Sequence, residues 1–452
     1  YLRLEAPAVG GRVSREFRLL SPQWSGSVSV FADLDGGLEE IGTQRIEAGT
    51  FRATSYEKGN RLSRDRLLKA LQGTVAFTLR SQVKDPEHPA RGGLYLFYDL
   101  DASVYRSYHW VWGWGPSVAM LLRASEALSG SVDSAAIRHA AQEIGEAGLR
   151  FVLHDPKAPL DGMLISRWDR NVSYEESYAG AVTVADALFF SGWAWIPLYE
   201  KTGDQRFLDA ARTQCTVTTS LFKDWTIPPH SYYFEMGEWS NWVIDEVGFG
   251  MEGYADLYRI APDPGLKKDA LEFIERHLSV FESEDGLWYR NYNFDTGSKT
   301  PSQHMTRGLG WAMEGLLAAH RIFPDGPYLK KAVRMAEAML PYQAEDGSWN
   351  WRYNQSLEEV GYSEKGTALW SYLLYELYNH TGEEKYCEAA RRALLWCLNN
   401  LYDGPDVEAN GSLVGCSPQS GVGYRRWFRV SCTYTSAFLG LAILEELNSS
   451  QP

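Results

Sequence analysis

The stretch LYEKTGDQRFLDAARTQ, residues 198–214, joins two amphipathic helical segments through a polar turn. Three later stretches repeat this design: LYRIAPDPGLKKDALEFI (257–274), HRIFPDGPYLKKAVRMAEAM (320–339) and LYNHTGEEKYCEAARRALL (377–395). A Gly or Pro in each turn ends one helix and allows the next to begin. The turn residues Thr202, Pro262, Pro324 and Thr381 follow one another at intervals of 60, 62 and 57 residues. This regular spacing predicts a stacked array of helical hairpins.

A second element recurs between these hairpins, a glycine turn followed by a short segment that is often aromatic. Its copies begin at Asp161, Asp285, Asp346 and Asn410, which are 124, 61 and 64 residues apart. The period is therefore the same, with one copy missing near residue 224. About six hairpins fit into the chain if an earlier pair near 114–153 and the apolar segment TYTSAFLGLAILEEL (433–447) are counted.

Six hairpins are enough to close a ring, provided that the last helix finds a partner near the start of the chain. We therefore predict a mainly α-helical protein, an (α/α)6 barrel over residues 101–452 with a β-rich N-terminal extension over residues 1–100. Alternating or β-branched sequence predicts strands in the extension, and LSRDRLLKAL (62–71) predicts a short helix. The predicted strands are 15–20, 27–34, 50–56, 74–82 and 94–100. The extension could cover the barrel, mediate a homo-oligomer or pack against the barrel wall.

Charge and composition restrict the partners. The 452 residues carry a formal net charge of −14, which disfavours nucleic acid and anionic membranes. We find no apolar run long enough for a membrane span, no cysteine spacing typical of zinc sites and no cluster of His. We therefore expect no metal and no cofactor. The 17 Trp and 26 Tyr include many in polar, glycine-rich contexts, which suits binding of sugar rings.

Two acids stand in register at the starts of successive inner helices. Asp186 lies in the apolar stretch VTVADALFFSGWAWIPLY (182–199), and Asp245 lies in NWVIDEVGFG, 59 residues later. Helix N-capping explains one such Asp well. Two acids one repeat apart favour a paired carboxylate site at the open end of the barrel, called the mouth below. Glu246 is then a first-turn acid favoured by the helix dipole.

Basic residues and a glycine motif occur near the same end. Arg307 and Trp311 begin the next inner helix, and Lys365 begins the one after it. An Arg fork beside two acids indicates an anionic sugar. The segment GFGMEG (248–253) fits G-x-G-x-x-G, but its helical surroundings favour close helix packing over a dinucleotide site.

These residues resemble the unsaturated glucuronyl and unsaturated rhamnogalacturonyl hydrolases, glycoside hydrolase families 88 and 105, over roughly residues 110–450. The resemblance lies in the 198–214 turn, the two register acids, R-G-x-G-W (307–311), YQAEDGSW (342–349) and LVGCSPQSGVG (413–423). It implies that Asp245 protonates C4 of a 4,5-unsaturated uronic acid, that Asp186 is its partner, and that water adds at C5. Here Met305, Leu309 and Arg290 replace the Trp, Asn and His that the family usually carries.

The predicted partner is an oligosaccharide with a terminal uronic acid. The predicted catalytic residues are Asp245 and Asp186, and the predicted substrate-binding residues are Trp242, Arg290, His304, Arg307, Trp311, Trp349, Trp351 and Lys365. Three alternatives stay open: direct hydrolysis of saturated β-glucuronides, a sugar epimerase or isomerase on the same barrel, and carbohydrate binding without catalysis.

Overall fold

The computed structural model describes residues 26–34, 37–46, 55–106, 110–130, 133–158, 160–167, 180–234, 236–245, 248–300, 305–415 and 429–449. The chain forms two compact units, residues 1–53 with 403–407 and residues 54–402 with 408–452. In the first unit, β1 (Gly26–Leu34) pairs antiparallel with β2 (Gly37–Ile46). The predicted strand 27–34 is confirmed, whereas 15–20 and most of 50–56 lie outside the described residues.

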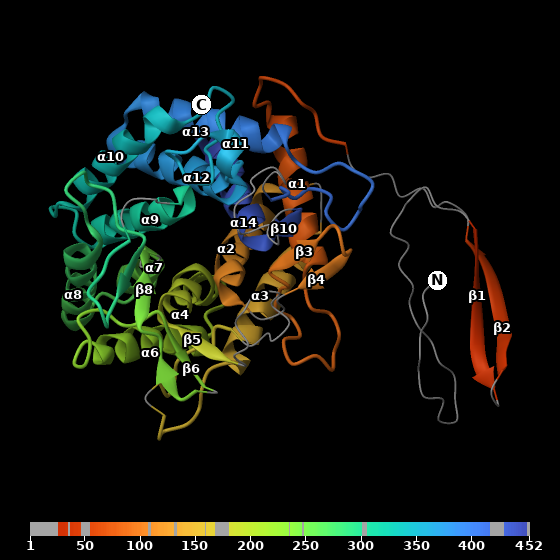
Figure 1. Ribbon diagram of the computed structural model, residues 1–452, viewed down its shortest axis with the longest axis horizontal. Coiled ribbons are helices and arrows are strands. Elements are labelled where there is room, and N and C mark those ends of the chain that lie inside the picture. Colours follow the sequence, from red (N-terminus) through yellow and green to blue (C-terminus); the bar gives the residue numbers. More distant parts are fainter. Residues whose placement is uncertain are drawn as a thin grey trace. The chain divides into compact units, whose positions relative to one another are not determined.

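The second unit is a closed ring of helical hairpins (Figure 1). Each inner helix packs against the next, and the last packs against the first, so the predicted (α/α)6 barrel is confirmed. The inner helices are α2 (Trp114–Ala127), α4 (Val184–Phe190), α7 (Gly248–Ile260), α9 (Thr306–Ile322), α12 (Glu364–Thr381) and α14 (Thr433–Ser449). Outside them lie α1 (Arg64–Arg80), α3 (Ser134–Arg150), α6 (Gln205–Leu221), α8 (Pro264–Phe281), α10 (Tyr328–Met339) and α13 (Glu384–Asn399).

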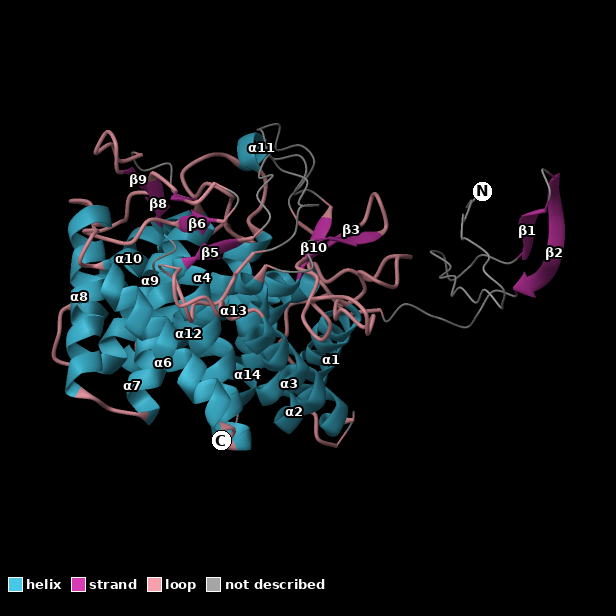
Figure 2. Ribbon diagram, turned by 90° about the horizontal axis from the view of Figure 1, so that it is seen from below, coloured by secondary structure: helices cyan, strands magenta, loops and turns pink. Residues whose placement is uncertain are grey.

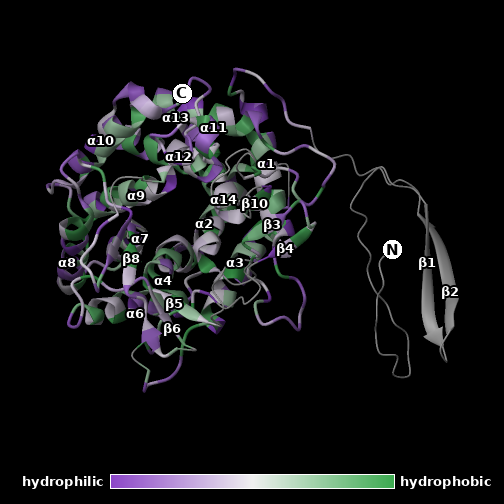
Figure 3. Ribbon diagram, viewed as in Figure 1, coloured by the Kyte–Doolittle hydropathy of each residue, from purple (hydrophilic) through white to green (hydrophobic). Residues whose placement is uncertain are grey.

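The inner and outer helices differ in hydropathy, and this difference places the core of the barrel between them. The helix α14 is buried along almost its whole length, as an inner helix must be, whereas the outer helices are amphipathic. Figure 3 shows the hydrophilic residues mainly on the outer rim of the ring. The partner that the last helix requires is α1, which packs against α14.

One predicted strand is wrong. Residues 74–82 were predicted as a strand because β-branched and aromatic residues alternate there, but α1 runs through Arg80. Its buried positions, such as Leu67, Leu71, Thr74 and Thr78, recur at helical spacing. The hydroxyls of Thr74 and Thr78 donate to the carbonyls of Leu71 and Thr74, so tertiary packing overrides β propensity without leaving a buried hydroxyl unsatisfied.

Short strands lie at one end of the helices, as the side view shows (Figure 2). They are β3 (Phe97–Asp99), β4 (Val104–Arg106), β5 (Ala181–Thr183), β6 (Ser231–Tyr233), β7 (Glu238–Trp239), β8 (Trp242–Ile244), β9 (Asn291–Asn293) and β10 (Val430–Cys432). Two inner helices begin directly after one of these strands: α4 after β5, and α14 after β10. The predicted strand 94–100 is thus reduced to β3, which pairs with β10.

The remaining regular elements are short connections: α5 (Ile196–Thr202), α11 (Leu357–Val360), 3₁₀ turns at Val111–Gly113 and Leu340–Tyr342, and a π-helical turn at Ser191–Trp195. The π-helical turn follows α4 and contacts α7 through two glycines. A Cβ on Gly192 would lie 2.7 Å from the Glu252 carbonyl, and one on Gly253 would lie 2.7 Å from the Leu188 carbonyl. Gly253 is the last glycine of GFGMEG, so the geometry supports close packing as its role.

The barrel interior holds carboxyl groups at one repeat spacing. Glu252, Glu314 and Glu376 lie on α7, α9 and α12, each 62 residues after the one before. Arg321 donates to Glu252, whereas Glu314 has no ion-pair partner among the described residues. Burial, reinforced by the charges of Glu252 and Glu376, raises the pKa of Glu314 well above its usual range, and the charge of Arg321 opposes this shift. Burial therefore favours the protonated form of Glu314 in the folded protein.

This burial predicts a pH-dependent stability. A carboxyl whose folded-state pKa is raised costs nothing below its unfolded-state pKa, and destabilises the fold as the pH rises above that value. We expect Glu314→Gln to raise the free energy of unfolding by about 1–2 kcal/mol at pH 8 and to change it little at pH 4. Urea denaturation across this pH range measures the effect, with the exposed Glu358→Gln as control. A constant difference at all pH values would contradict the prediction.

Candidate active site

The register of a short sheet at the mouth places Asp245 opposite Arg290. The strands β8 and β9 pair antiparallel with Ile244 opposite Asn291, and the Asp245 amide donates to the Arg290 carbonyl at 3.1 Å. Nη1 of Arg290 also contacts Oδ1 of Asp245. The Asp245 side chain is fully buried, whereas that of Arg290 is 19% exposed. A buried carboxylate is thus charge-paired at the start of α7.

The glycine after Arg307 makes room for this carboxylate. A Cβ on Gly308 would lie 2.5 Å from Oδ2 of Asp245 and 3.1 Å from its Cγ. Gly308 lies in the first turn of α9. The start of α9 therefore packs against Asp245, the acid that precedes the neighbouring inner helix α7. The R-G pair therefore does two things: Arg307 supplies charge, and Gly308 supplies space.

Asp186 lies in the first turn of α4 and is 3% exposed. A chain of backbone hydrogen bonds joins its segment to that of Asp245 through His230. The Val184 amide donates to the His230 carbonyl at 3.2 Å, and the His230 amide donates to the Trp242 carbonyl at 2.9 Å. The imidazole of His230 also stacks on the half-buried indole of Trp242, with ring centroids 4.2 Å apart. Because α4 packs against α7, the two acids begin neighbouring inner helices.

Tryptophan rings surround the guanidinium of Arg307. Its Cζ lies 4.7 Å from the ring centroid of Trp311, 5.7 Å from that of Trp112 and 5.8 Å from that of Trp351. Burial, followed by the positive charge of Arg290, lowers the pKa of Arg307. Among the described residues no carboxylate forms an ion pair with Arg307, and its Nε has no acceptor. A half-buried cation in this state favours an anion from outside the chain.

The remaining predicted substrate-binding residues divide into three groups. Arg290 and Trp311 belong to the same cluster, because the Arg290 Cζ lies 5.6 Å from the Trp311 ring centroid. Lys365 and Trp349 are almost fully buried: Lys365 is paired with Glu364, and the Trp349 indole donates to the Met339 carbonyl at 3.2 Å. Their burial favours a supporting role. His304 lies outside the described residues, as does Glu246.

Sequence reasoning missed four residues of this cluster. Trp112 lies in the aromatic run 108–115, and its partner Tyr434 accepts from Nε1 of Trp311 at 2.8 Å. His230 and Gly308 complete the set. The R-G-x-G-W motif contained a signal for Gly308, but the side chain that needs its space is 63 residues away in the chain.

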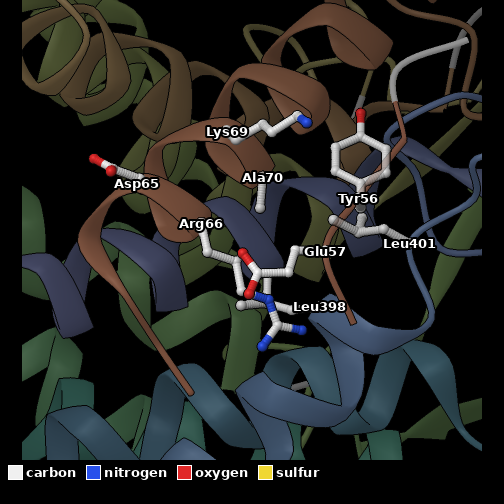
Figure 4. Close-up of a pocket in the computed structure, with 8 residues that line it drawn as sticks. All are labelled: Tyr56, Glu57, Asp65, Arg66, Lys69, Ala70, Leu398 and Leu401. Carbon is white, nitrogen blue, oxygen red and sulfur yellow. The ribbon is translucent and has the colours of Figure 1, made fainter. Parts of the chain in front are cut away.

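A separate small pocket lies at α1 and the end of α13 (Figure 4). Arg66, one of its lining residues, donates to the Arg61 carbonyl at 2.7 Å and to Oδ1 of Asn399 at 2.7 Å. Its guanidinium is therefore occupied by internal contacts. No group of metal-ligating side chains occurs in the described part of the chain, and no described helix is long and apolar enough to cross a membrane.

Comparison with known proteins identifies the class. The chain resembles a solved unsaturated glucuronyl hydrolase specific for heparin (16% identity, TM-score 0.63, covering 86% of this chain and 99% of that one). It also resembles the unsaturated glucuronyl hydrolase of Bacillus sp. GL1 (15%, 0.63, 85% and 97%) and a polysaccharide lyase (17%, 0.57, 86% and 99%). These likenesses place the fold among (α/α)6-barrel glycosidases and related enzymes. No curated protein matches the sequence.

The sequence profile described as Glycosyl Hydrolase Family 88 matches residues 167–444, more than half of the chain. The protein belongs to this family and is a glycoside hydrolase.

Proposed function

We propose that the protein is an exo-acting hydrolase that removes a terminal 4,5-unsaturated uronic acid from an oligosaccharide. The observation that carries this proposal is the arginine pair at the mouth: Arg290 and Arg307 both face the Trp311 ring beside the buried Asp245. Guanidinium groups bind carboxylates through paired hydrogen bonds, and an aromatic ring stacks on the apolar face of a sugar. Membership in Family 88 and likeness to glucuronyl hydrolases support the same substrate class.

In this proposal Asp245 donates a proton to C4 of the unsaturated ring, and water adds at C5. The resulting hemiketal opens and releases the remaining sugar. Asp186, which begins the neighbouring inner helix, orients the water or takes its proton. Arg307 holds the carboxylate of the uronic acid, and Trp311 and Trp351 form the walls around that guanidinium.

A second candidate is direct hydrolysis of saturated β-glucuronides, and the Arg290–Asp245 pair favours it. A guanidinium in contact with a carboxylate favours the ionised form, which suits a base that activates water. Arg290 also stands where the family usually carries His, so this chain departs from its relatives at the partner of the acid.

Product analysis separates the candidates. The enzyme is incubated with matched disaccharides that carry either a saturated or an unsaturated terminal uronic acid. We expect the enol-ether ultraviolet absorbance of the unsaturated substrate to fall, and mass spectrometry to detect a free uronic acid one water lighter than glucuronic acid. Release of glucuronic acid from the saturated substrate alone would favour the second candidate. A rise in absorbance would indicate a lyase, and intact disaccharides would exclude hydrolysis of this substrate class.

A further inference from the structure

We propose that Arg290 is an exchangeable partner of Asp245. It binds the Asp245 carboxylate in the free protein and turns to the carboxylate of the uronic acid when the substrate enters. Asp245 then takes a proton from solvent and becomes the acid that the reaction requires. This inference rests on the proposed function. In it the substrate carboxylate contributes to binding and also causes Asp245 to become protonated.

The accessible member of the ion pair is the arginine. The Asp245 side chain is fully buried, with Gly308 against one face, whereas Arg290 is 19% exposed. An incoming anion therefore meets Arg290 before it can meet Asp245. A guanidinium has five N–H donors and can hold two carboxylates at once or pass from one to the other by a small rotation.

The guanidinium of Arg307 favours the movement of Arg290 from Asp245 to the substrate. The Arg290 and Arg307 Cζ atoms lie 5.6 Å and 4.7 Å from the centroid of the same Trp311 ring, and the charge of Arg290 acts on Arg307. Among the described residues, Arg290 is paired with Asp245 and Arg307 has no carboxylate partner, so the charge of Arg307 is available to a ligand. A substrate carboxylate between the two guanidiniums balances both and draws Arg290 away from Asp245.

Among the described residues, the other charged groups near Asp245 do not replace Arg290. Lys365, on α12, is buried against its neighbour Glu364. Asp186, on α4, is an acid like Asp245 and cannot replace Arg290 as its ion-pair partner. The bound complex therefore gains one substrate carboxylate and one proton, and the charge balances.

The proposal predicts that substrate selectivity appears in kcat. A glycoside without a carboxylate, or a uronic acid methyl ester, leaves Arg290 on Asp245 and the acid ionised. Weak binding alone would raise KM and leave the turnover of the bound ligand unchanged. Exchange instead lowers the turnover of a neutral ligand even at saturation.

Calorimetry tests the exchange without relying on turnover. D-Glucuronate is titrated into the protein at pH 7 in two buffers with different ionisation enthalpies, with D-glucose as neutral ligand. We expect proton uptake that approaches one per glucuronate bound, and none with glucose. Asp245→Asn should bind glucuronate without proton uptake, and Arg290→Gln should bind it more weakly with reduced uptake. Arg290→Lys should restore part of the uptake, because it keeps the charge and loses the fork.

Arg307→Gln is the matched control. It removes a guanidinium from the same ring without removing the partner of Asp245, so glucuronate should bind more weakly while the uptake per bound ligand is unchanged. Binding to the unmodified protein without proton uptake, or uptake that persists in Asp245→Asn, would overturn the exchange and leave the proposed hydrolysis intact. Absence of both glucuronate binding and uronyl hydrolysis would overturn the proposed function, and the exchange with it.

Discussion

Asp245→Asn is expected to lower kcat by about 10³-fold, equivalent to roughly 4 kcal/mol of activation free energy. The amide has nearly the same shape as the carboxyl group and still accepts a hydrogen bond from Arg290, but it cannot donate the proton that the proposed reaction needs. The expected loss therefore lies in kcat, with a smaller effect on KM. Steady-state kinetics on the best uronyl disaccharide measures both constants.

The fold of this variant should be intact. Asp245 is buried and paired, so circular dichroism and thermal unfolding must show a cooperative transition before the kinetic loss is interpreted. Asp256→Asn is the matched control, because Asp256 lies on α7 as well and pairs with Arg259 at 3.3 Å. We expect it to keep kcat within about twofold of the unmodified enzyme. An Asp245→Asn enzyme with a tenth or more of the original kcat would contradict the assignment of Asp245.

The barrel could be predicted from the sequence because its helical hairpins repeat at a regular spacing. A helix pair that recurs about every 60 residues needs neighbours on both sides, and the apolar segment 433–447 required a partner near the start of the chain. Residues 62–71, which include the first half of that partner, α1, were predicted as a helix of the N-terminal extension rather than of the barrel, and the second half of α1 was predicted as a strand. Burial against α14 decided the structure of residues 74–80, and local propensity carries no signal for such contacts.

The candidate site was predictable only in part, for a related reason. Register along the repeat brought Asp186 and Asp245 to the same end of the barrel, and Arg307 followed from the same register. The contact between Asp245 and Arg290 depends on the pairing of two short strands that the sequence analysis did not predict. Periodicity predicts which residues share an end of the barrel, but it does not predict which of their side chains touch.

The candidate site residues gather at one end of the barrel because of where the inner helices begin. The acids and Arg307 all lie at or just before the first turn of an inner helix, where the strands at the mouth hold the entering chain. These positions come from segments far apart in the sequence, and they lie at the starts of neighbouring inner helices. A substitution at the start of one inner helix therefore acts on residues at the start of the next.

Gly308→Ala tests this coupling, and we expect it to lower kcat/KM by about 10²-fold. The new methyl carbon would lie 2.5 Å from Oδ2 of Asp245, well inside normal contact distance. Either the Asp245 side chain rotates and loses its contact with Arg290, or the start of α9 moves and takes Arg307 with it. Both responses disturb the distance between the acid and the guanidiniums, and a shift of about 1 Å in a catalytic group costs this much rate.

Gly310→Ala is the control that distinguishes an effect on the position of Asp245 from an effect on the stability of the fold. It lies two residues further along α9 and has the same gain in helix propensity, but its Cβ would meet Cδ2 of Leu369 at 2.6 Å. A Leu side chain in the barrel wall can adjust, so this variant should lose thermal stability and keep most of its kcat. Gly308→Ala should show the reverse, a small change in Tm with a large loss of turnover. Equal kinetics for the two variants would mean that the contact between Gly308 and Asp245 does not position the acid, and that the space beside Asp245 serves packing alone.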